Sequence, residues 1–199
     1  MSEVLSISHR NIKMGEIPSV SLPPTVTCRK DAPCKKMCYA RRMCRYTSVS
    51  KAYDRNLKLY LNDPDSFFAQ LKAGLYMSRF FRLHVSGDFA DAEYFRRCCE
   101  VVAEVPTCTV LAFTKKYEIV NEYLNNGGII PANFKIIFST WGEWKPENPY
   151  GIPESAVIFR NTEVPKAWKI CGGNCISCAC RGVGCWELKS GETIAFHKH

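Results

Sequence analysis

Apolar side chains recur three or four positions apart over residues 50–77, a spacing that predicts two consecutive amphipathic helices. The first helix is expected to begin at Ser50 and to end at Asn62. Asp63 and Pro64 then predict the start of the second helix, because Asp is a favoured N-cap residue and Pro fits the first helical position. The side chains expected to face the core are Tyr53, Leu57, Tyr60 and Leu61 in the first helix, and Phe67, Phe68, Leu71, Leu75 and Met77 in the second.

Short apolar runs alternate with helical patterns over residues 80–160. Strands are predicted at 80–85, 109–113, 134–140 and 156–160, and helices at 92–104 and 117–124. Strands that alternate with helices at this spacing are typical of parallel sheets with right-handed crossovers. We therefore expect an α/β fold in which βα units form a parallel sheet. An open doubly wound sheet and a partial (β/α) barrel both fit the pattern, and we favour the partial barrel.

Polar residues follow three of the predicted strands. The carboxyl ends of parallel strands meet at one edge of the sheet, where ligands bind in both doubly wound sheets and barrels. His84, Asp88 and Lys115 are expected at this edge together with residues 139–141, and these three are the candidate catalytic residues. A structural role for His84, through a bond to neighbouring backbone, is an equal alternative. For Lys115 the alternative is an exposed lysine pair at the start of a helix.

The composition indicates a single α/β domain over residues 1–199. A chain of 199 residues with 46% hydrophobic and 23% charged residues can bury one sizeable core and has no compositional sign of disorder. No apolar run follows a basic start at the N-terminus, and no run of about 18 apolar residues is present that could span a bilayer. We therefore expect a cytoplasmic protein without a membrane partner.

Most of the 12 cysteines are clustered near the two ends of the chain. In a reducing compartment, closely spaced cysteines indicate metal ligation or redox chemistry more often than disulfides. The spacing in residues 165–190 allows four thiolates to surround one metal centre, because glycines let the backbone turn tightly. A compact and irregular spacing favours a [4Fe–4S] cluster, and zinc is the alternative. The candidate ligands are Cys171, Cys175, Cys178 and Cys185, whereas Cys180 has no assigned role.

The N-terminal cysteine-rich segment covers residues 20–48 and is expected to be irregular, because prolines interrupt it. Its candidate metal ligands are Cys28, Cys34 and Cys38. Three cysteine ligands leave one iron of a cluster open to substrate, whereas Cys44 as a fourth ligand would close the site. The remaining cysteines are expected to pack in the core as small hydrophobic side chains. They are Cys98, Cys99 and Cys108.

The net charge of +8 is concentrated around the N-terminal cysteines. Residues 28–45 contain seven Lys or Arg and one Asp, a local balance of 7 − 1 = +6. Such a segment can bind nucleic acid, which makes nucleic acid a candidate partner. The same charges can also lower thiolate pKa values and offset an anionic cluster. We favour the second interpretation.

Several motifs resemble the gene product 88 family of phage and bacterial proteins over almost the whole chain. They are VTCRKDAPCKKMCYARR, FRLHVSGDFADAEYF, LAFTKKYEIVNEYL and CWELKSGE. The family name supplies no reaction. The pattern is also distantly similar to radical S-adenosylmethionine enzymes, and this resemblance implies a [4Fe–4S] cluster on Cys28, Cys34 and Cys38 with S-adenosylmethionine as a candidate ligand. The residues in the place of the methionine-binding motif are Ser86, Gly87 and Asp88.

Two hypotheses of function follow from the sequence. The first is an iron–sulfur protein with two clusters, one near each end of the chain, that performs redox or radical chemistry on an unknown substrate and takes electrons from a donor. The second is a zinc-stapled nucleic-acid-binding protein without catalysis, in which the basic segment makes the contacts.

Overall fold

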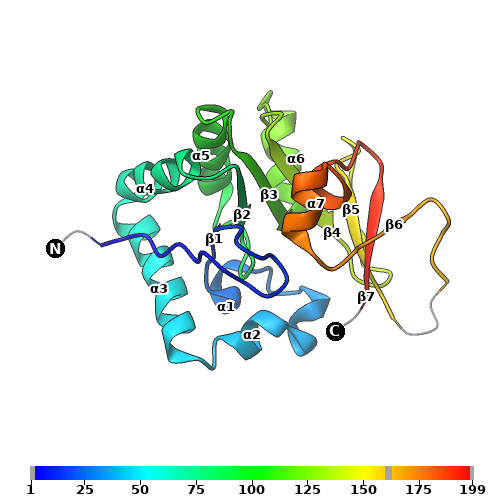
Figure 1. Cartoon of the computed structure of the whole chain (residues 1–199), viewed down its shortest axis with the longest axis horizontal. Coiled ribbons are helices and arrows are strands. Elements are labelled where there is room, and N and C mark those ends of the chain that lie inside the picture. The colour runs from blue at the N-terminus through cyan, green and yellow to red at the C-terminus, as the bar shows by residue number, and fades with distance from the viewer. Residues whose placement is uncertain (1–2, 160–162, 198–199) are drawn as a thin grey trace.

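The computed structural model describes residues 3–159 and 163–197, which form a seven-stranded sheet whose paired strands all run parallel (Figure 1). The order of the strands across the sheet is β1-β2-β3-β4-β5-β7-β6. The predicted α/β class with a parallel sheet is therefore confirmed. The strands are β1 Ser19–Val20, β2 Phe80–Leu83, β3 Thr109–Thr114, β4 Phe134–Ser139, β5 Glu154–Ile158, β6 Lys169–Ile170 and β7 Thr193–His197.

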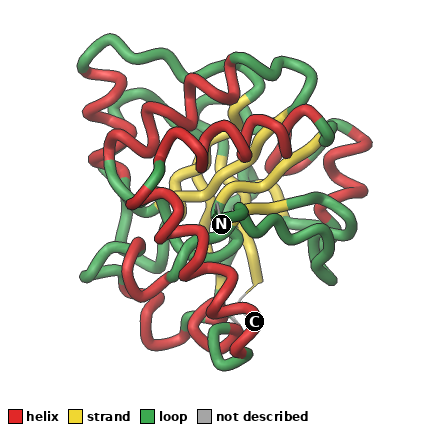
Figure 2. Tube along the Cα trace, turned by 90° about the vertical axis from the view of Figure 1, so that its left-hand side faces the viewer, coloured by secondary structure: helices red, strands yellow, loops and turns green. Residues whose placement is uncertain are grey.

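Helices cover the two faces of the sheet unequally (Figures 1 and 2). One face packs against α3 Thr47–Asn62, α4 Pro64–Tyr76, α5 Ala92–Ala103 and α6 Tyr117–Asn125. The other face packs against α7 Cys175–Arg181, the 3-10 helix η2 Gly184–Trp186 and the chain before β1. The long connection from β1 to α3 contains α1 Pro24–Thr27, the 3-10 helix η1 Pro33–Met37 and α2 Tyr39–Met43.

The two faces produce two separate hydrophobic clusters, because successive side chains of a strand point to opposite faces. In β3, for example, Val110 belongs to the large cluster beneath α3–α6, whereas Leu111 belongs to a smaller cluster with Trp186. The predicted packing of Cys98, Cys99 and Cys108 is confirmed, since each is at most 2% exposed within the large cluster.

The strands and helices between residues 80 and 139 agree with the prediction, whereas the outer strands at the two edges of the sheet differ from it. The pattern does not predict strands β1, β6 and β7. Two of them have only two residues, too few to show an alternating pattern. Strand β7 contains the strand-favouring residues Thr193, Ile194 and Phe196, but the prediction did not extend beyond the second cysteine group. The predicted strand at 156–160 corresponds to β5, and residue 160 lies outside the described residues.

Two apolar side chains expected in the core are exposed, so these predictions were wrong. Leu61 is 64% exposed, because it directly follows buried Tyr60 and points about 100° away from it around the helix. Met77 is 88% exposed, because α4 ends at Tyr76 and Met77 is its C-cap residue. Within the described residues, no helix has the length and apolar character needed to cross a bilayer.

The carboxyl ends of β1 to β4 meet at the lower edge of the sheet in Figure 1. The strand register places them together, since Val20 pairs with Leu83, Leu83 with Ala112, and Thr114 with Phe138. The segment that follows β1 therefore lies beside the turn that follows β2 and the residues that follow β3. These three segments carry most of the candidate residues.

Candidate functional site

The three candidate ligands after β1, here called the N-terminal cysteine group (Cys28, Cys34 and Cys38), lie close enough to influence one another electrostatically. Burial raises the pKa of the Cys28 thiol to about 12, and the charges of Asp88, Cys38 and Cys34 contribute to that rise. Burial likewise raises the pKa of Cys34, with a further contribution from Cys38. All three side chains are partly exposed. The structure thus brings the N-terminal cysteine group together at the carboxyl edge.

Cys44 lies farther along the same segment, in the turn between α2 and α3. The pKa of its thiol is raised by burial, then by Asp54 and Cys38. Cys44 therefore lies within electrostatic range of one member of the N-terminal cysteine group, Cys38.

The turn of residues 86–88 contacts the chain between β1 and Cys28 and holds it against the sheet. The Leu22 amide donates to the Ser86 carbonyl at 3.0 Å, and the Asp88 amide donates to Thr27 Oγ1 at 3.0 Å. Gly87 has a φ of 80°, and a Cβ atom there would lie 2.5 Å from the Leu22 carbonyl oxygen. Only glycine fits this backbone conformation and this close approach. These contacts hold the chain that leads to Cys28.

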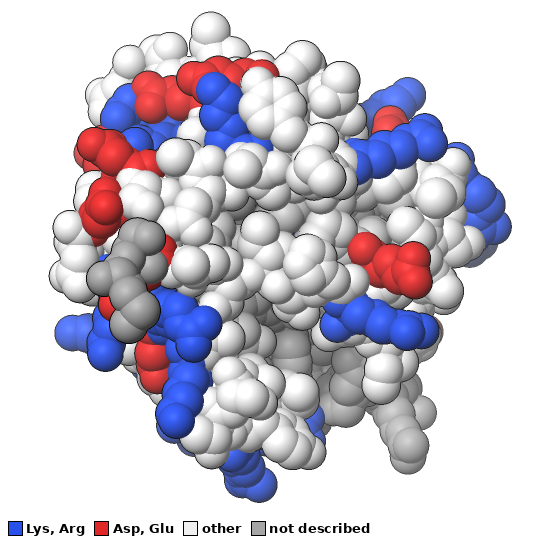
Figure 3. Space-filling model, turned by 60° about the vertical axis from the view of Figure 1, so that its left-hand side comes forward, with Lys and Arg blue, Asp and Glu red and all other residues white. Residues whose placement is uncertain are grey.

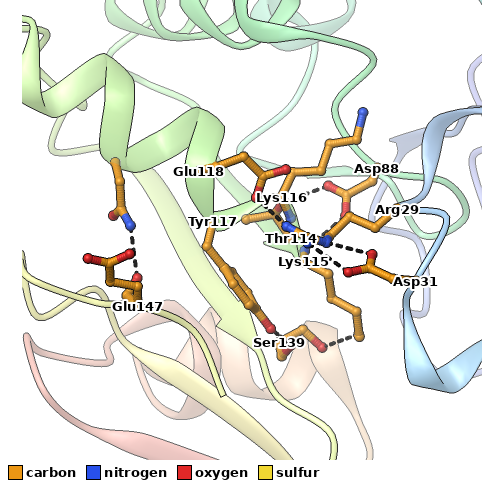
Figure 4. Close-up of polar contacts among 11 residues, drawn as sticks. Arg29, Asp31, Asp88, Thr114, Lys115, Lys116, Tyr117, Glu118, Ser139 and Glu147 are labelled. Atoms are coloured by element: carbon orange, nitrogen blue, oxygen red, sulfur yellow. Dashed lines mark hydrogen bonds and ion pairs between the residues drawn. The ribbon is translucent and has the colours of Figure 1, made fainter. Parts of the chain in front are cut away.

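Asp88 joins the end of β2 to the end of β3 (Figure 4). Its carboxylate accepts hydrogen bonds from Thr114 Oγ1 at 2.7 Å, from the Lys115 amide at 2.9 Å and from the Phe89 amide at 2.9 Å. The side chain is buried, and burial raises its pKa, while the hydrogen bonds from Lys115 and Thr114 oppose that rise. Three donors thus share the two carboxylate oxygens, which makes Asp88 a structural anchor beside the thiols.

Lys115 supplies a positive charge close to Cys28 and Cys34. Its Nζ donates to Ser139 Oγ at 2.6 Å, and the Tyr117 hydroxyl donates to the Ser139 carbonyl (Figure 4). The charge of Lys115 lowers the pKa of Cys28 and Cys34, against the effect of burial. Residues from the ends of β2, β3 and β4 therefore lie together, as predicted.

Arg29 connects the N-terminal cysteine group to α6 (Figure 4). Its guanidinium pairs with Asp31 at 2.8 Å and with Glu118 at 2.6 Å. The same group lies 5.6 Å from the ring centroid of Trp144. The charge of Arg29 is thus neutralised by contacts within the protein.

His84 lies in the aromatic core beneath the site. It is 4% exposed, its Nε2 lies 3.1 Å from the Tyr94 hydroxyl, and its ring packs edge-on against Phe89. Burial lowers its pKa to about 3, with further contributions from the charges of Arg82 and Lys116. Its backbone has a φ of 60°, which is uncommon for a residue other than glycine. These contacts match the structural alternative, although the partner is a tyrosine hydroxyl rather than backbone.

The second set of ligand candidates, here called the C-terminal cysteine group (Cys171, Cys175, Cys178 and Cys185), lies around α7 on the other face of the sheet. Burial raises the pKa of Cys185 to about 12, and the other three thiols contribute to that rise. Asn174 caps α7 by accepting from the Ser177 amide at 2.9 Å, and Gly182 ends the helix with a φ of 61°. Cys180 is exposed on α7. All four predicted ligands therefore interact electrostatically.

Arg82 is a site residue that the sequence pattern did not identify. It projects from β2 toward α7, with its guanidinium 4.8 Å from the Phe113 ring centroid. Its charge lowers the pKa of Cys175, Cys185 and Tyr39, so it lies within electrostatic range of the C-terminal cysteine group and of Tyr39, which directly follows Cys38. Its Nε is buried and has no hydrogen-bond partner in the described part of the chain. A charged residue inside the apolar run FFRL is the signal that could have identified it.

No group of three or more His, Cys, Asp or Glu side chains among residues 3–159 and 163–197 has the arrangement of a metal-ion site. The sequence profile of the gene product 88 family matches residues 5–191. No curated protein and no solved structure matches the chain. The similarity to radical S-adenosylmethionine enzymes has no support from these comparisons, and the site must be interpreted from its own residues.

Proposed function

Since the chain belongs to the gene product 88 family, whose name assigns no reaction, we propose from the site itself that the protein is an iron–sulfur enzyme. The N-terminal cysteine group would hold one [4Fe–4S] cluster at the carboxyl edge of the sheet. The observation that carries this proposal is the convergence of its three thiols with Asp88 and Lys115 at the edge where parallel sheets bind ligands. Three cysteine ligands would leave one iron open.

The residues around the N-terminal cysteine group have distinct roles in this proposal. A bound cluster would supply one-electron chemistry. Lys115, held by Ser139, is the cation that would bind a carboxylate of the ligand at the open iron. Residues 86–88 would position the cysteine segment, because their contacts are to Leu22 and Thr27. S-adenosylmethionine is the ligand that we propose for this position.

The C-terminal cysteine group would hold a second [4Fe–4S] cluster and pass electrons to the first. Its four thiolates and the cluster would form an anionic centre, and Arg82 supplies a positive charge beside it. Arg82 also acts on Tyr39, whose hydroxyl donates to the Val85 carbonyl at the end of β2. Arg82 would thus be a positive charge shared by the second proposed centre and by Tyr39, which directly follows Cys38.

We also propose that the sheet curves as a partial (β/α) barrel. Strands β1 to β5 follow one another in sequence order, and α3 to α6 pack on one face. Doubly wound sheets instead reverse their strand order and have crossover helices on both faces, whereas the second face here packs against the short helices α7 and η2. The side chains of the opposite face, including Leu111 and Ile137, would then fill the barrel interior.

Purification without oxygen tests the two clusters. We expect absorption at about 400 nm, and about eight irons and eight sulfides per chain, since each cluster contains four of each. Alanine at Cys28, Cys34 and Cys38 should remove about half of the iron, and alanine at the C-terminal cysteine group the other half. Cys180→Ala, an exposed cysteine outside both groups, is the matched control and should retain all of it. Colourless protein that holds stoichiometric zinc after anaerobic iron reconstitution would overturn the proposal.

The ligand of the open iron needs a separate experiment. Reduced protein incubated with S-adenosylmethionine is expected to form 5′-deoxyadenosine, and Lys115→Met should weaken the binding of S-adenosylmethionine while iron is retained. If iron-loaded protein neither binds nor cleaves S-adenosylmethionine, this ligand is rejected. The assignment of the clusters would be unaffected by that result.

A further inference from the structure

The segment around α2 presents several exposed positive charges. We define the basic surface as Lys36, Arg41, Arg42, Arg45 and Tyr46, all of which are exposed. Residues 32–53 contain no Asp or Glu. Within the part of the chain that the structure describes, none of the four cations forms an ion pair, whereas Arg29 pairs with two carboxylates. The basic surface therefore has unneutralised charge that faces solvent.

The sequence leaves two uses for these charges, as counter-charges for an anionic cluster or as contacts for nucleic acid. Because all four cations are exposed and lack ion pairs within the described residues, they are available to a separate anionic partner.

The basic surface lies beside the candidate site. Tyr39 of α2 donates its hydroxyl to the Val85 carbonyl, which ties this helix to the end of β2. In Figure 1 α2 lies below the carboxyl ends of the strands. Figure 3, which shares the vertical axis of Figure 1, shows several Lys and Arg side chains among uncharged residues along the lower part of one face. A partner on this surface would therefore lie next to the N-terminal cysteine group.

We propose that the basic surface binds single-stranded nucleic acid. Phosphates would contact the four cations, and an unpaired base would stack on Tyr46, whose side chain is 64% exposed. The run of cations without acidic residues over 32–53 matches a phosphate backbone, and the exposed ring of Tyr46 beside it offers the stacking face that distinguishes nucleic acid from an acidic protein. We further infer that this nucleic acid is the substrate of the site at the N-terminal cysteine group, an inference that rests on the proposed function.

Anisotropy of fluorescein-labelled oligonucleotides of about 15 nucleotides, as DNA and as RNA, tests the binding. We expect binding that weakens steeply with salt, with a log–log slope of about −0.7 for each phosphate that the protein neutralises. The double variant Arg41→Glu with Arg42→Glu should lose at least about tenfold in affinity. The matched control, Lys58→Glu with Lys166→Glu, makes the same charge change at exposed positions outside the basic surface and should bind like the wild type.

Three outcomes would overturn the inference. Absence of binding by iron-loaded wild-type protein, or an equal loss in the control variant, would reject the basic surface as the binding site. Equal competition by a duplex of the same length would reject the preference for single strands. Salt-dependent binding of an acidic flavodoxin, lost in the Arg41–Arg42 variant and without oligonucleotide binding, would assign the surface to a protein donor instead.

The substrate role has its own readout. Added oligonucleotide is expected to change the electron paramagnetic resonance spectrum of the reduced wild-type protein, but not that of the Arg41–Arg42 variant. Binding without a spectral change would reject the nucleic acid as substrate and leave the binding surface intact. Protein that binds oligonucleotide but holds no iron would instead reject the proposed function alone.

Discussion

Asp88 and Lys115 are neighbours in the site, but the structure leaves them different amounts of free bonding capacity. The two oxygens of Asp88 already accept three hydrogen bonds, and the side chain is buried. The ammonium of Lys115 has three protons, and its one described hydrogen bond is to Ser139 Oγ. Of the predicted catalytic residues, Lys115 therefore retains the greatest capacity to bind a ligand, and Asp88 positions it.

Alanine at Gly87 is expected to destabilise the protein more than alanine at Gly127. Both glycines have a φ of 80°, so each substitution introduces backbone strain of about 1–3 kcal/mol. A Cβ at position 87 would also lie 2.5 Å from the Leu22 carbonyl oxygen, whereas position 127 has no heavy atom within 4 Å. Urea denaturation of both variants measures the difference in the free energy of unfolding. Equal decreases would contradict the proposed role of Gly87 as a close contact.

The buried imidazole of His84 predicts a loss of stability in acid. Its pKa is about 3 in the folded protein against an ordinary value of 6.5, so below pH 6.5 the unfolded chain binds a proton that the folded chain does not. The free energy of unfolding should therefore fall by up to about 1.4 kcal/mol per pH unit from this group as the pH drops toward 4. His84→Asn removes the titration and keeps a residue that tolerates a φ of 60°. Unfolding curves at several pH values should show a shallower slope in the variant, and parallel slopes would refute the expectation.

At the scale of elements, local signals are sufficient where a helix or strand is defined by its own residues. Asp63 and Asp91 cap α4 and α5 in the structure, and β2, β3 and β4 lie where apolar runs occur. The short strands β1 and β6 depend on pairing with distant residues, which a local pattern does not reveal. The cysteine spacing likewise identifies both groups, but the role of Arg82 depends on the packing of α7 against β2.

The cap of α7 offers a test at this scale. Asn174→Ala should cost about 1 kcal/mol and fray a helix of only seven residues that carries Cys175 and Cys178. We therefore expect the variant to lose iron from the C-terminal cysteine group, about half of the total if each group holds one cluster. Asp63→Ala is the matched control, because Asp63 caps α4 through the Ser66 amide at 3.0 Å and α4 contains no cysteine. Iron analysis and thermal unfolding of both variants compare the two effects, and equal iron contents would contradict the prediction.

At the scale of the whole molecule, the sheet separates two regions with different sources of stability. The large cluster beneath α3–α6 contains buried aromatic side chains such as Phe67, Tyr94 and Phe95, and none of the proposed ligands. The smaller cluster includes three members of the C-terminal cysteine group packed around Ala179 and Trp186. The first region has an extensive apolar core that needs no metal, whereas the second would depend on bound metal.

Removal of metal should therefore affect the two regions unequally. We expect trypsin to cleave chelator-treated protein after basic residues near the two cysteine groups, at 29–45 and at 166–189, because these short helices and turns lose their cross-links. A fragment that spans α3 to β4 should resist cleavage, since its core contains no ligand. Iron-loaded protein treated in the same way is the control and should resist cleavage at both places. Uniform digestion after chelation would mean that the large cluster also depends on the metal, and unchanged digestion would mean that neither cysteine group is stabilised by one.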